Sequence, residues 1–245
     1  MIILPRKIKA DKFNNLVAEF GFRILKQTNY YHNNYQSCEM IHFIYLLLIN
    51  KDIEKIFELN LIEIDSLFIS CLILNYLHPC VREEYLEEKD SDISLLYNDY
   101  MIIENFQLSE TLKLIKRNEN CDIFDGLSRD ERKYLKKLIL KLVRSSHIKK
   151  IRKINQKLTS FCTFAEKNSH NSISKIKLEN LEFFEKLKVT LMKSIIIISK
   201  TSFLFKPNQI CQEWINRLYE ETKMNEIPNK ENDIGNSIKS SIIEL

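Results

Sequence analysis

The chain has 245 residues, 44% of them hydrophobic, which is enough to build one sizeable core. Its formal net charge of +4 is too small to indicate a dedicated nucleic-acid-binding domain, and only 3 Gly and 4 Pro argue against a fold rich in tight turns. The 6 Cys include no Cys-x-x-Cys pair, which favours reduced thiols. No apolar run approaches the roughly 20 residues of a transmembrane helix. We therefore expect an intracellular, cytoplasmic protein.

Apolar residues recur every three or four positions along most of the chain, which predicts an all-α fold. The expected helices cover residues 12–27, 37–49, 53–59, 62–77, 91–97, 102–114, 128–143, 147–158, 178–198 and 210–221. Ser128 and Glu131 have the spacing of a capping box, and Pro79 is expected to end the helix that begins at Ile62. We therefore expect a helical domain over residues 11–221, with a loop at residues 167–177, then a polar tail over residues 222–245 that frays.

Charge is unevenly distributed: residues 83–104 are acidic, whereas residues 144–177 are basic, with Glu166 as the only acid. Within the basic region, one helix face is expected to pack inward and the other to remain in water. The inward residues are Ile148, Ile151, Ile154 and Leu158, and the solvated ones are Lys149, Lys150, Arg152, Lys153 and Lys157. A solvated helix face is the simpler interpretation, and a surface for nucleic acid or a membrane is the less favoured alternative.

Several short polar segments interrupt the apolar helices in an informative order. A lone histidine such as His32 is more often structural than catalytic, so the surrounding pattern decides its interpretation. The segments are Tyr31-His32-Asn33, His78-Pro79, Tyr97-Asn98-Asp99 and Ile103-Glu104-Asn105, followed by Pro207, Trp214 and Glu220-Glu221.

In this order and spacing the segments resemble the class I cyclic-nucleotide phosphodiesterases, metal-dependent hydrolases of the HD type. The family signature Tyr-His-Asn-x-x-His-Ala corresponds to residues 31–37, which read YHNNYQS, and His-Asp-x-x-His-Pro-Gly corresponds to residues 74–80, which read LNYLHPC. The family's Ala-Asp-x-Ser stretch corresponds to residues 199–202, which read SKTS. The resemblance implies a compact multi-helix bundle like that catalytic domain, shortened at the C-terminus.

The resemblance also implies where the chemistry of the family would lie. In the family, two His and two Asp hold zinc, a second metal shares one Asp, and the hydroxide between the metals attacks the cyclic phosphate. His32 corresponds to the general acid, and Asn33, His78 and Glu104 correspond to cleft positions around the metals. The four zinc-ligand positions are occupied by Gln36, Leu74, Asn75 and Lys200, so no intact metal site is expected.

These replacements favour a degenerate phosphodiesterase-like protein, a pseudoenzyme that acts as a binding or regulatory module without a metal cofactor. Its expected partner is an unidentified protein, and a cyclic nucleotide is a second candidate ligand. The alternative is an active phosphodiesterase that hydrolyses cyclic AMP or cyclic GMP with zinc and magnesium at an atypical site, supported by His32, His78 and Glu104. The family's purine-binding glutamine and aromatic clamp have no counterpart in the polar tail.

Overall fold

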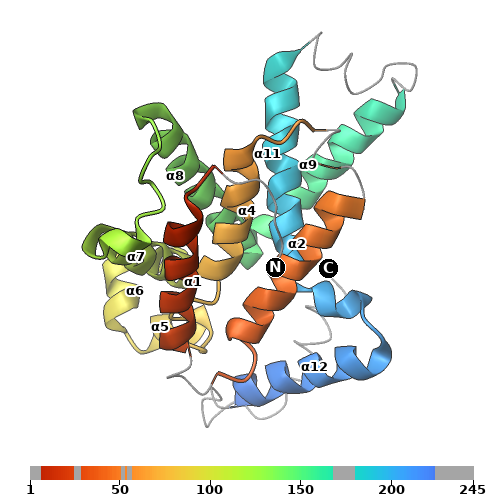
Figure 1. Ribbon diagram of the computed structural model, residues 1–245. Helices are drawn as coiled ribbons and strands as arrows, with labels where there is room; N and C mark the ends of the chain where they lie inside the picture. The colour runs from red at the N-terminus through yellow and green to blue at the C-terminus, as the bar shows by residue number, and fades with distance from the viewer. Residues whose placement is uncertain (1–6, 25–28, 51–52, 54–56, 168–179, 224–245) are drawn as a thin grey trace.

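The computed structural model describes residues 7–24, 29–50, 53, 57–167 and 180–223, in which every regular element is a helix (Figure 1). This confirms the predicted all-α fold. The α-helices are α1 (Ala10–Ile24), α2 (Asn34–Asn50), α4 (Leu61–Ile73), α5 (Glu83–Glu88), α6 (Asp92–Tyr97), α7 (Ile102–Arg117), α8 (Arg129–Val143), α9 (Ile148–Lys167), α11 (Leu181–Lys200) and α12 (Asn208–Lys223).

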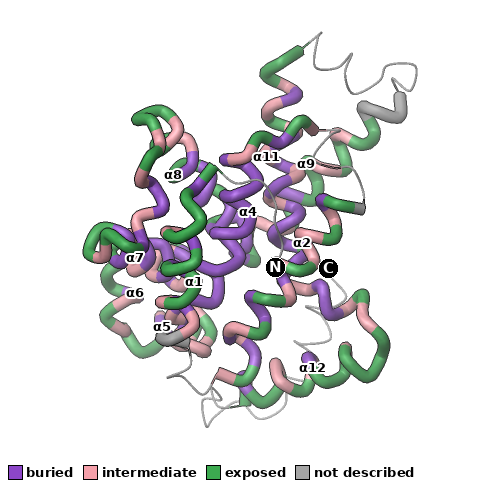
Figure 2. The backbone as a smooth tube through the Cα atoms, viewed as in Figure 1, coloured by how far each residue is buried: buried purple, intermediate pink, exposed green. Residues whose placement is uncertain are grey.

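Helix α4 forms the centre of the core (Figure 2). Every residue from Ile62 to Ile73 is buried, because α2, α8 and α11 all pack around this one helix. A helix that is apolar on all sides is stable only when neighbouring helices surround it. Helix α4 therefore fixes the positions of the helices that carry the candidate site.

Two acidic residues on α4 are fully buried, and each has partners from other segments. The carboxylate of Glu63 lies 3.0 Å from the Lys188 ammonium of α11 and accepts a 2.6 Å hydrogen bond from the Tyr134 hydroxyl of α8. Asp65 accepts the backbone N–H groups of Lys7 and Ile8. Buried charges are stable only when they are paired and hydrogen-bonded, so these contacts join α8, α11 and the N-terminal segment to α4.

Helix α4 ends at Ile73, four residues before the predicted end at Leu77, so the expectation that Pro79 terminates it is wrong. The amide of Gln107, from α7, donates a 2.8 Å hydrogen bond to the backbone carbonyl of Leu74. That carbonyl would otherwise accept the next helical hydrogen bond. The chain instead turns sharply, and Leu77 adopts a left-handed conformation with φ of 51°.

Other expectations are confirmed or corrected at the level of single elements. The Ser128–Glu131 capping box is present at the start of α8, whereas α5 was not predicted and α9 extends nine residues beyond the expected end at Leu158. Residues 54–56 of the expected helix 53–59 lie outside the described residues, as do 168–177 of the expected loop and 224–245 of the expected tail. In the described part of the chain, no helix is both long and apolar enough to cross a membrane.

The basic helix α9 faces the core largely as expected. Ile154 is buried, Ile151 and Leu158 are half-buried, and most of the predicted outward residues are exposed. Ile148 is the exception, because its side chain is 62% exposed at the first residue of the helix. At that position the helix begins beside an open cleft, so there is no packed layer to cover the side chain.

Candidate functional site

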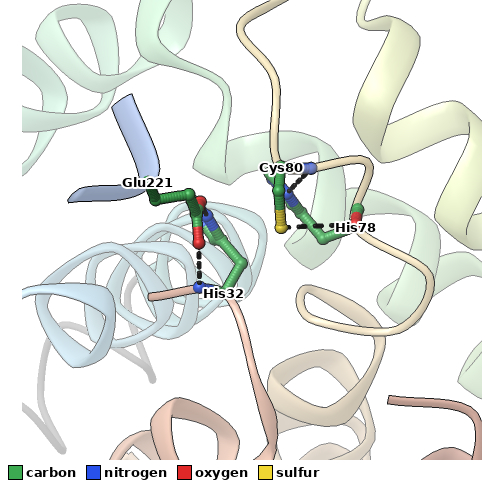
Figure 3. Close-up of side chains that lie close together, drawn as sticks. All are labelled: His32, His78, Cys80 and Glu221. Atoms are coloured by element: carbon green, nitrogen blue, oxygen red, sulfur yellow. Dashed lines mark hydrogen bonds and ion pairs between the residues drawn. The ribbon is translucent and has the colours of Figure 1, made fainter. Parts of the chain in front are cut away.

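Three segments that are distant in the sequence bring four polar side chains together (Figure 3). His32 comes from the turn before α2, His78 and Cys80 come from the turn after α4, and Glu221 comes from the last turns of α12. Their nitrogen, sulfur and oxygen ligand atoms all lie within 4.8 Å of one another. The site therefore depends on the packing of α12 against the turns that follow α1 and α4.

Glu221 holds the segment that carries His32. One carboxylate oxygen accepts the backbone N–H groups of Tyr31 and His32 at 2.8 and 2.9 Å, and the other contacts Nδ1 of the His32 ring. Although burial alone would raise the pKa of Glu221, the hydrogen bonds from His32 and Tyr31 lower it below its usual value. Glu221 is therefore an ionised anchor for this turn.

The imidazole ring of His78 stacks on that of His32, with ring centroids 3.6 Å apart and an interplanar angle of 7°. Nδ1 of His78 accepts a 3.0 Å hydrogen bond from the backbone N–H of Cys80. Burial, followed by the proximity of His32 and Lys200, lowers the pKa of His78 well below its usual value. His78 is therefore neutral at physiological pH.

Cys80 occupies the position at which the family signature has glycine, yet it keeps a left-handed backbone conformation with φ of 55°. Most L-residues are strained in this region because Cβ approaches the following carbonyl oxygen. The Cys80 thiol donates to the backbone carbonyl of His78 at 3.5 Å, and burial together with Glu221 raises its pKa. The sulfur is thus a protonated, weakly nucleophilic group.

An open cleft of about 300 Å³ lies on the other side of His78. Glu104 and Lys200 both line it, together with Leu74 and His147. Burial lowers the pKa of Lys200, and the nearby Glu104 opposes this shift. Burial likewise raises the pKa of Glu104, with Lys200 and His147 opposing. The two groups therefore compensate each other's charge within the cleft.

His147 and Glu83 form a second ion pair at the cleft wall. Nε2 of His147 lies 2.7 Å from the Glu83 carboxylate, which also accepts the backbone N–H of Ile103. The hydrogen bond to Glu83 raises the pKa of His147 against the effect of burial. This pair joins α5 to the start of α9 and holds the cleft wall together.

The structure brings together three of the residues singled out from the sequence. His32 stacks on His78, and His78 and Glu104 line one cleft, but Glu104 bonds to neither histidine and faces Lys200 and His147. Asn33 lies outside the cleft: its side chain accepts the backbone N–H of Gln36 and donates to the carbonyls of Asn29 and Tyr30. Its amide oxygen and nitrogen both form hydrogen bonds at the start of α2, and a role of Asn33 near the cleft stays a prediction.

Sequence reasoning assigned no role to three further residues of the site. Glu221 lies seven positions after the buried Trp214, on the same face of α12. An acidic residue on the buried face of a helix was the sequence feature that could have indicated its role. Cys80 and His147 gave no such signal. Their contacts with Glu221 and Glu83 join residues that are more than 60 positions apart.

Comparison with known proteins identifies the fold and the family. The sequence model of the 3',5'-cyclic nucleotide phosphodiesterase family matches residues 31–240, which is most of the chain. The chain belongs to this phosphodiesterase family. All the polar segments that carried the resemblance lie within the matched region.

Curated relatives of this phosphodiesterase domain are longer proteins. The 3',5'-cyclic-AMP phosphodiesterase 4C of Mus musculus is 26% identical over 191 residues, covering 78% of this chain and 26% of the relative. The probable 3',5'-cyclic-AMP phosphodiesterase pde-4 of Caenorhabditis elegans is 23% identical over 195 residues, covering 80% of this chain and 27% of the relative. The chain therefore spans about a quarter of the length of these two proteins.

Solved phosphodiesterase structures share the fold at low sequence identity. The structure of LmjPDEB1 in complex with IBMX aligns with a TM-score of 0.73 and 18% identity, over 87% of this chain and 59% of that chain. The phosphodiesterase domain of Salpingoeca rosetta rhodopsin phosphodiesterase aligns with a TM-score of 0.72 and 17% identity, over 87% of this chain and 60% of that chain. These alignments establish a shared helical architecture.

The residues that the resemblance assigns to the phosphodiesterase metal positions do not fit zinc. Leu74 is buried and has no ligand atom in its side chain, and the side-chain amide of Asn75 donates to the Ser37 hydroxyl at 3.0 Å. Gln36 is also buried, and its amide nitrogen has no hydrogen-bond partner. Zinc in proteins is bound by thiolate, imidazole and carboxylate groups, none of which occurs at these positions or at Lys200.

Neither of the two groups of potential ligand side chains compensates for this loss. A metal must lie close to the plane of each imidazole that binds it, and the parallel rings of His32 and His78 cannot share one ion at about 2 Å without rotating. In the second group, Glu83 and His147 are paired with each other, and Glu104 faces the Lys200 ammonium. A divalent cation there would have to displace the pair of Glu83 and His147 and would be repelled by Lys200.

Proposed function

We propose that this phosphodiesterase-like domain does not hydrolyse cyclic nucleotides and acts as a binding or regulatory module. One observation carries the proposal: Lys200, at a position where the family has a metal-binding aspartate, lines the cleft with its charge compensated by Glu104. A cation at this position excludes a divalent metal and leaves no carboxylate to bind one.

Electrostatics in the cleft support this interpretation. Glu104 is buried and Lys200 is partly buried, so each would be costly as an isolated charge. Each opposes the effect of burial on the pKa of the other, so the cleft pairs one negative group with one positive group at the position where the family would bind a metal.

The retention of His32 has a structural explanation that does not need catalysis. His32 forms a charge-assisted contact with Glu221, which also fixes two backbone N–H groups of the same turn, and it provides the surface on which His78 stacks. Loss of this imidazole would leave the buried Glu221 carboxylate without its main partner. Architecture alone is therefore a sufficient reason to keep it.

The cleft itself is suited to binding. A volume of about 300 Å³ lies at the lower end of small-molecule pockets, and its walls combine the apolar Leu74, Ile103 and Ile197 with charged groups. A side chain or short segment of a partner protein fits this mixture. The alternative function, an active cyclic-nucleotide phosphodiesterase, rests on the retained residues His32, His78 and Glu104 together with the phosphodiesterase relatives.

Metal content distinguishes the two functions. Protein purified without chelators is analysed by inductively coupled plasma mass spectrometry, and we expect well under one equivalent of zinc or magnesium per chain. Added zinc should leave the thermal midpoint unchanged, because a ligand that binds only the folded state would raise it. One tightly held equivalent that is lost in the variant Glu104→Gln would instead support the active enzyme.

A further inference from the structure

A groove of about 480 Å³, distinct from the cleft, lies where α8, α9 and α11 meet. It shares no lining residue with the cleft around Lys200. The basic side chains that line it have the spacing of one helix face. Those of α9 lie at positions i, i+3 and i+7, and those that start in α8 lie at i, i+4 and i+7. Its charged residues are Lys137, Lys141, Arg144, Lys150, Lys153, Lys157 and Lys193.

The positive charge of this basic groove is not neutralised within the described part of the protein. None of its lining residues is acidic, and none of its six lysines forms an ion pair with a described residue. Arg144 donates only to the neutral side chain of Asn105, at 2.9 Å. Like charges gathered in a concave surface repel one another, so this clustering costs folding free energy.

Lys193 shows that the groove differs from an ordinary solvated helix face. It lies half-buried on α11, behind the exposed lysines of α8 and α9. Burial lowers its pKa, and Lys141, Lys157 and Lys150 lower it further. Lysines on a solvated face extend independently into water, whereas these four lysines from three helices act on one another across a shared space.

We infer that the basic groove binds a compact anion that carries several phosphate groups, either as a free polyphosphorylated molecule or as the headgroup of a lipid. Seven cations around one groove of about 480 Å³ favour clustered phosphates over an extended polymer, which needs a long basic track. Leu140 and Ile154 in the lining leave room for a small apolar or ring-shaped scaffold between the phosphates. The inference is independent of whether the cleft hydrolyses a nucleotide.

Calorimetric titration with inositol hexakisphosphate in about 0.15 M salt tests the inference, with this compound serving as the probe. We expect saturable one-to-one binding that weakens steeply as salt is raised, since screening shortens the reach of the charges. The double variant Lys153→Glu with Lys157→Glu should lose about tenfold or more in affinity for each reversed charge.

A matched control is available on the same helix. Lys149 and Arg152 are exposed on α9 but do not line the groove, so Lys149→Glu with Arg152→Glu changes the net charge equally. This control should bind the probe within about threefold of the wild type, because screened charges outside the groove contribute little. Equal losses in both double variants would show a general charge effect and overturn the inference. Absence of binding by the folded wild type would do the same.

Vesicles distinguish the source of the phosphates. Binding to vesicles that contain a few per cent phosphatidylinositol 4,5-bisphosphate, with loss in the Lys153→Glu/Lys157→Glu variant alone, would identify a lipid headgroup as a ligand. Binding only to the free probe would identify a diffusible polyphosphate. Equal binding to phosphatidylserine vesicles of the same charge, or a clear preference for single-stranded RNA over the compact probe, would overturn the inference.

Discussion

The imidazole rings of His32 and His78 lie parallel, with their centroids 3.6 Å apart, at the point where the turns after α1 and α4 meet. Two charged imidazoles at this distance would repel each other strongly in a buried site. The two rings have different surroundings: His32 contacts the Glu221 carboxylate, whereas His78 accepts a backbone hydrogen bond and has its pKa lowered by burial. The stack therefore requires a neutral His78.

This requirement predicts that stability falls as the solution is acidified. The pKa of His78 is lowered in the folded protein, so the unfolded chain takes up a proton below about pH 6.5 that the folded chain excludes. The contribution of neutral His78 is complete above that pH and is lost below it, by up to about 1.4 kcal/mol per pH unit. Urea unfolding at pH 7, 6 and 5 measures this slope.

The variant His78→Asn isolates the effect, because its side-chain oxygen can still accept the Cys80 N–H. We expect a shallower fall in unfolding free energy between pH 6.5 and 5 than in the wild type. His147 has a raised pKa, so its stabilising effect is complete below about pH 6.5 and is lost only at higher pH, outside this window. A variant of the exposed His42 is the control and should keep the wild-type slope. If His78→Asn also keeps that slope, the assignment to His78 is contradicted.

Glu221 is predicted to be a major anchor of the turn before α2. Replacing it with Gln places an amide donor against backbone N–H groups, so at least one of the contacts to Tyr31 and His32 is lost. We expect a loss of about 2 kcal/mol in unfolding free energy, typical of a buried hydrogen bond to a charged group. Chemical denaturation measures the change.

Glu220 provides the control for this substitution. It precedes Glu221 on α12 but points to solvent, where it pairs only with Lys223 at 3.4 Å. Because exposed ion pairs contribute little, Glu220→Gln should leave the unfolding midpoint unchanged. Equal effects of the two substitutions would mean that the contacts of Glu221 do not stabilise the turn.

Cys80 is predicted to be strained, because its φ of 55° is adopted more readily by glycine. Cys80→Gly and Cys80→Ala both remove the sulfur, but only glycine also removes Cβ. We therefore expect the glycine variant to be more stable than the alanine variant by about 1 kcal/mol, as judged from denaturant midpoints. An alanine variant that matches or exceeds the glycine variant would show that the turn carries no strain.

Much of the helical fold could be predicted because apolar spacing and capping residues report local structure. The Ser128 capping box is one example, and the start of α7 at Ile102 is another. The end of α4 could not be predicted, because the Gln107 side chain that takes the Leu74 carbonyl comes from another helix, 33 positions away. Local propensity gives no information about such a contact.

The candidate site shows the same division. His32, His78 and Glu104 stood out because their neighbours in the sequence match the family pattern. Glu221 could not be assigned a role in advance, since its partners Tyr31 and His32 are about 190 positions earlier and only tertiary packing joins them. Asn33 matches the same pattern, and the contacts that the structure gives its side chain are local ones at the start of α2.

Restoring the family's metal ligands tests whether the four replaced positions were aligned correctly with the family signatures. We predict that Gln36→His, Leu74→His, Asn75→Asp and Lys200→Asp together will convert the folded domain into one that binds about one equivalent of zinc. The variant with only Lys200→Asp should not, because one carboxylate does not make a tetrahedral site. Failure of the folded fourfold variant to bind zinc would show that these positions do not surround a common point.

Turnover of cyclic AMP and cyclic GMP by the purified protein, with zinc, magnesium or manganese supplied, tests the central claim most directly. General-acid assistance is worth about 10²–10⁴-fold, whereas enzymes typically need accelerations of 10⁶-fold or more, so His32 without a metal-activated nucleophile falls short. We predict no hydrolysis above the uncatalysed rate, with wild type and His32→Ala indistinguishable. Metal-dependent hydrolysis by the wild type that disappears in His32→Ala would contradict the account and establish an active phosphodiesterase.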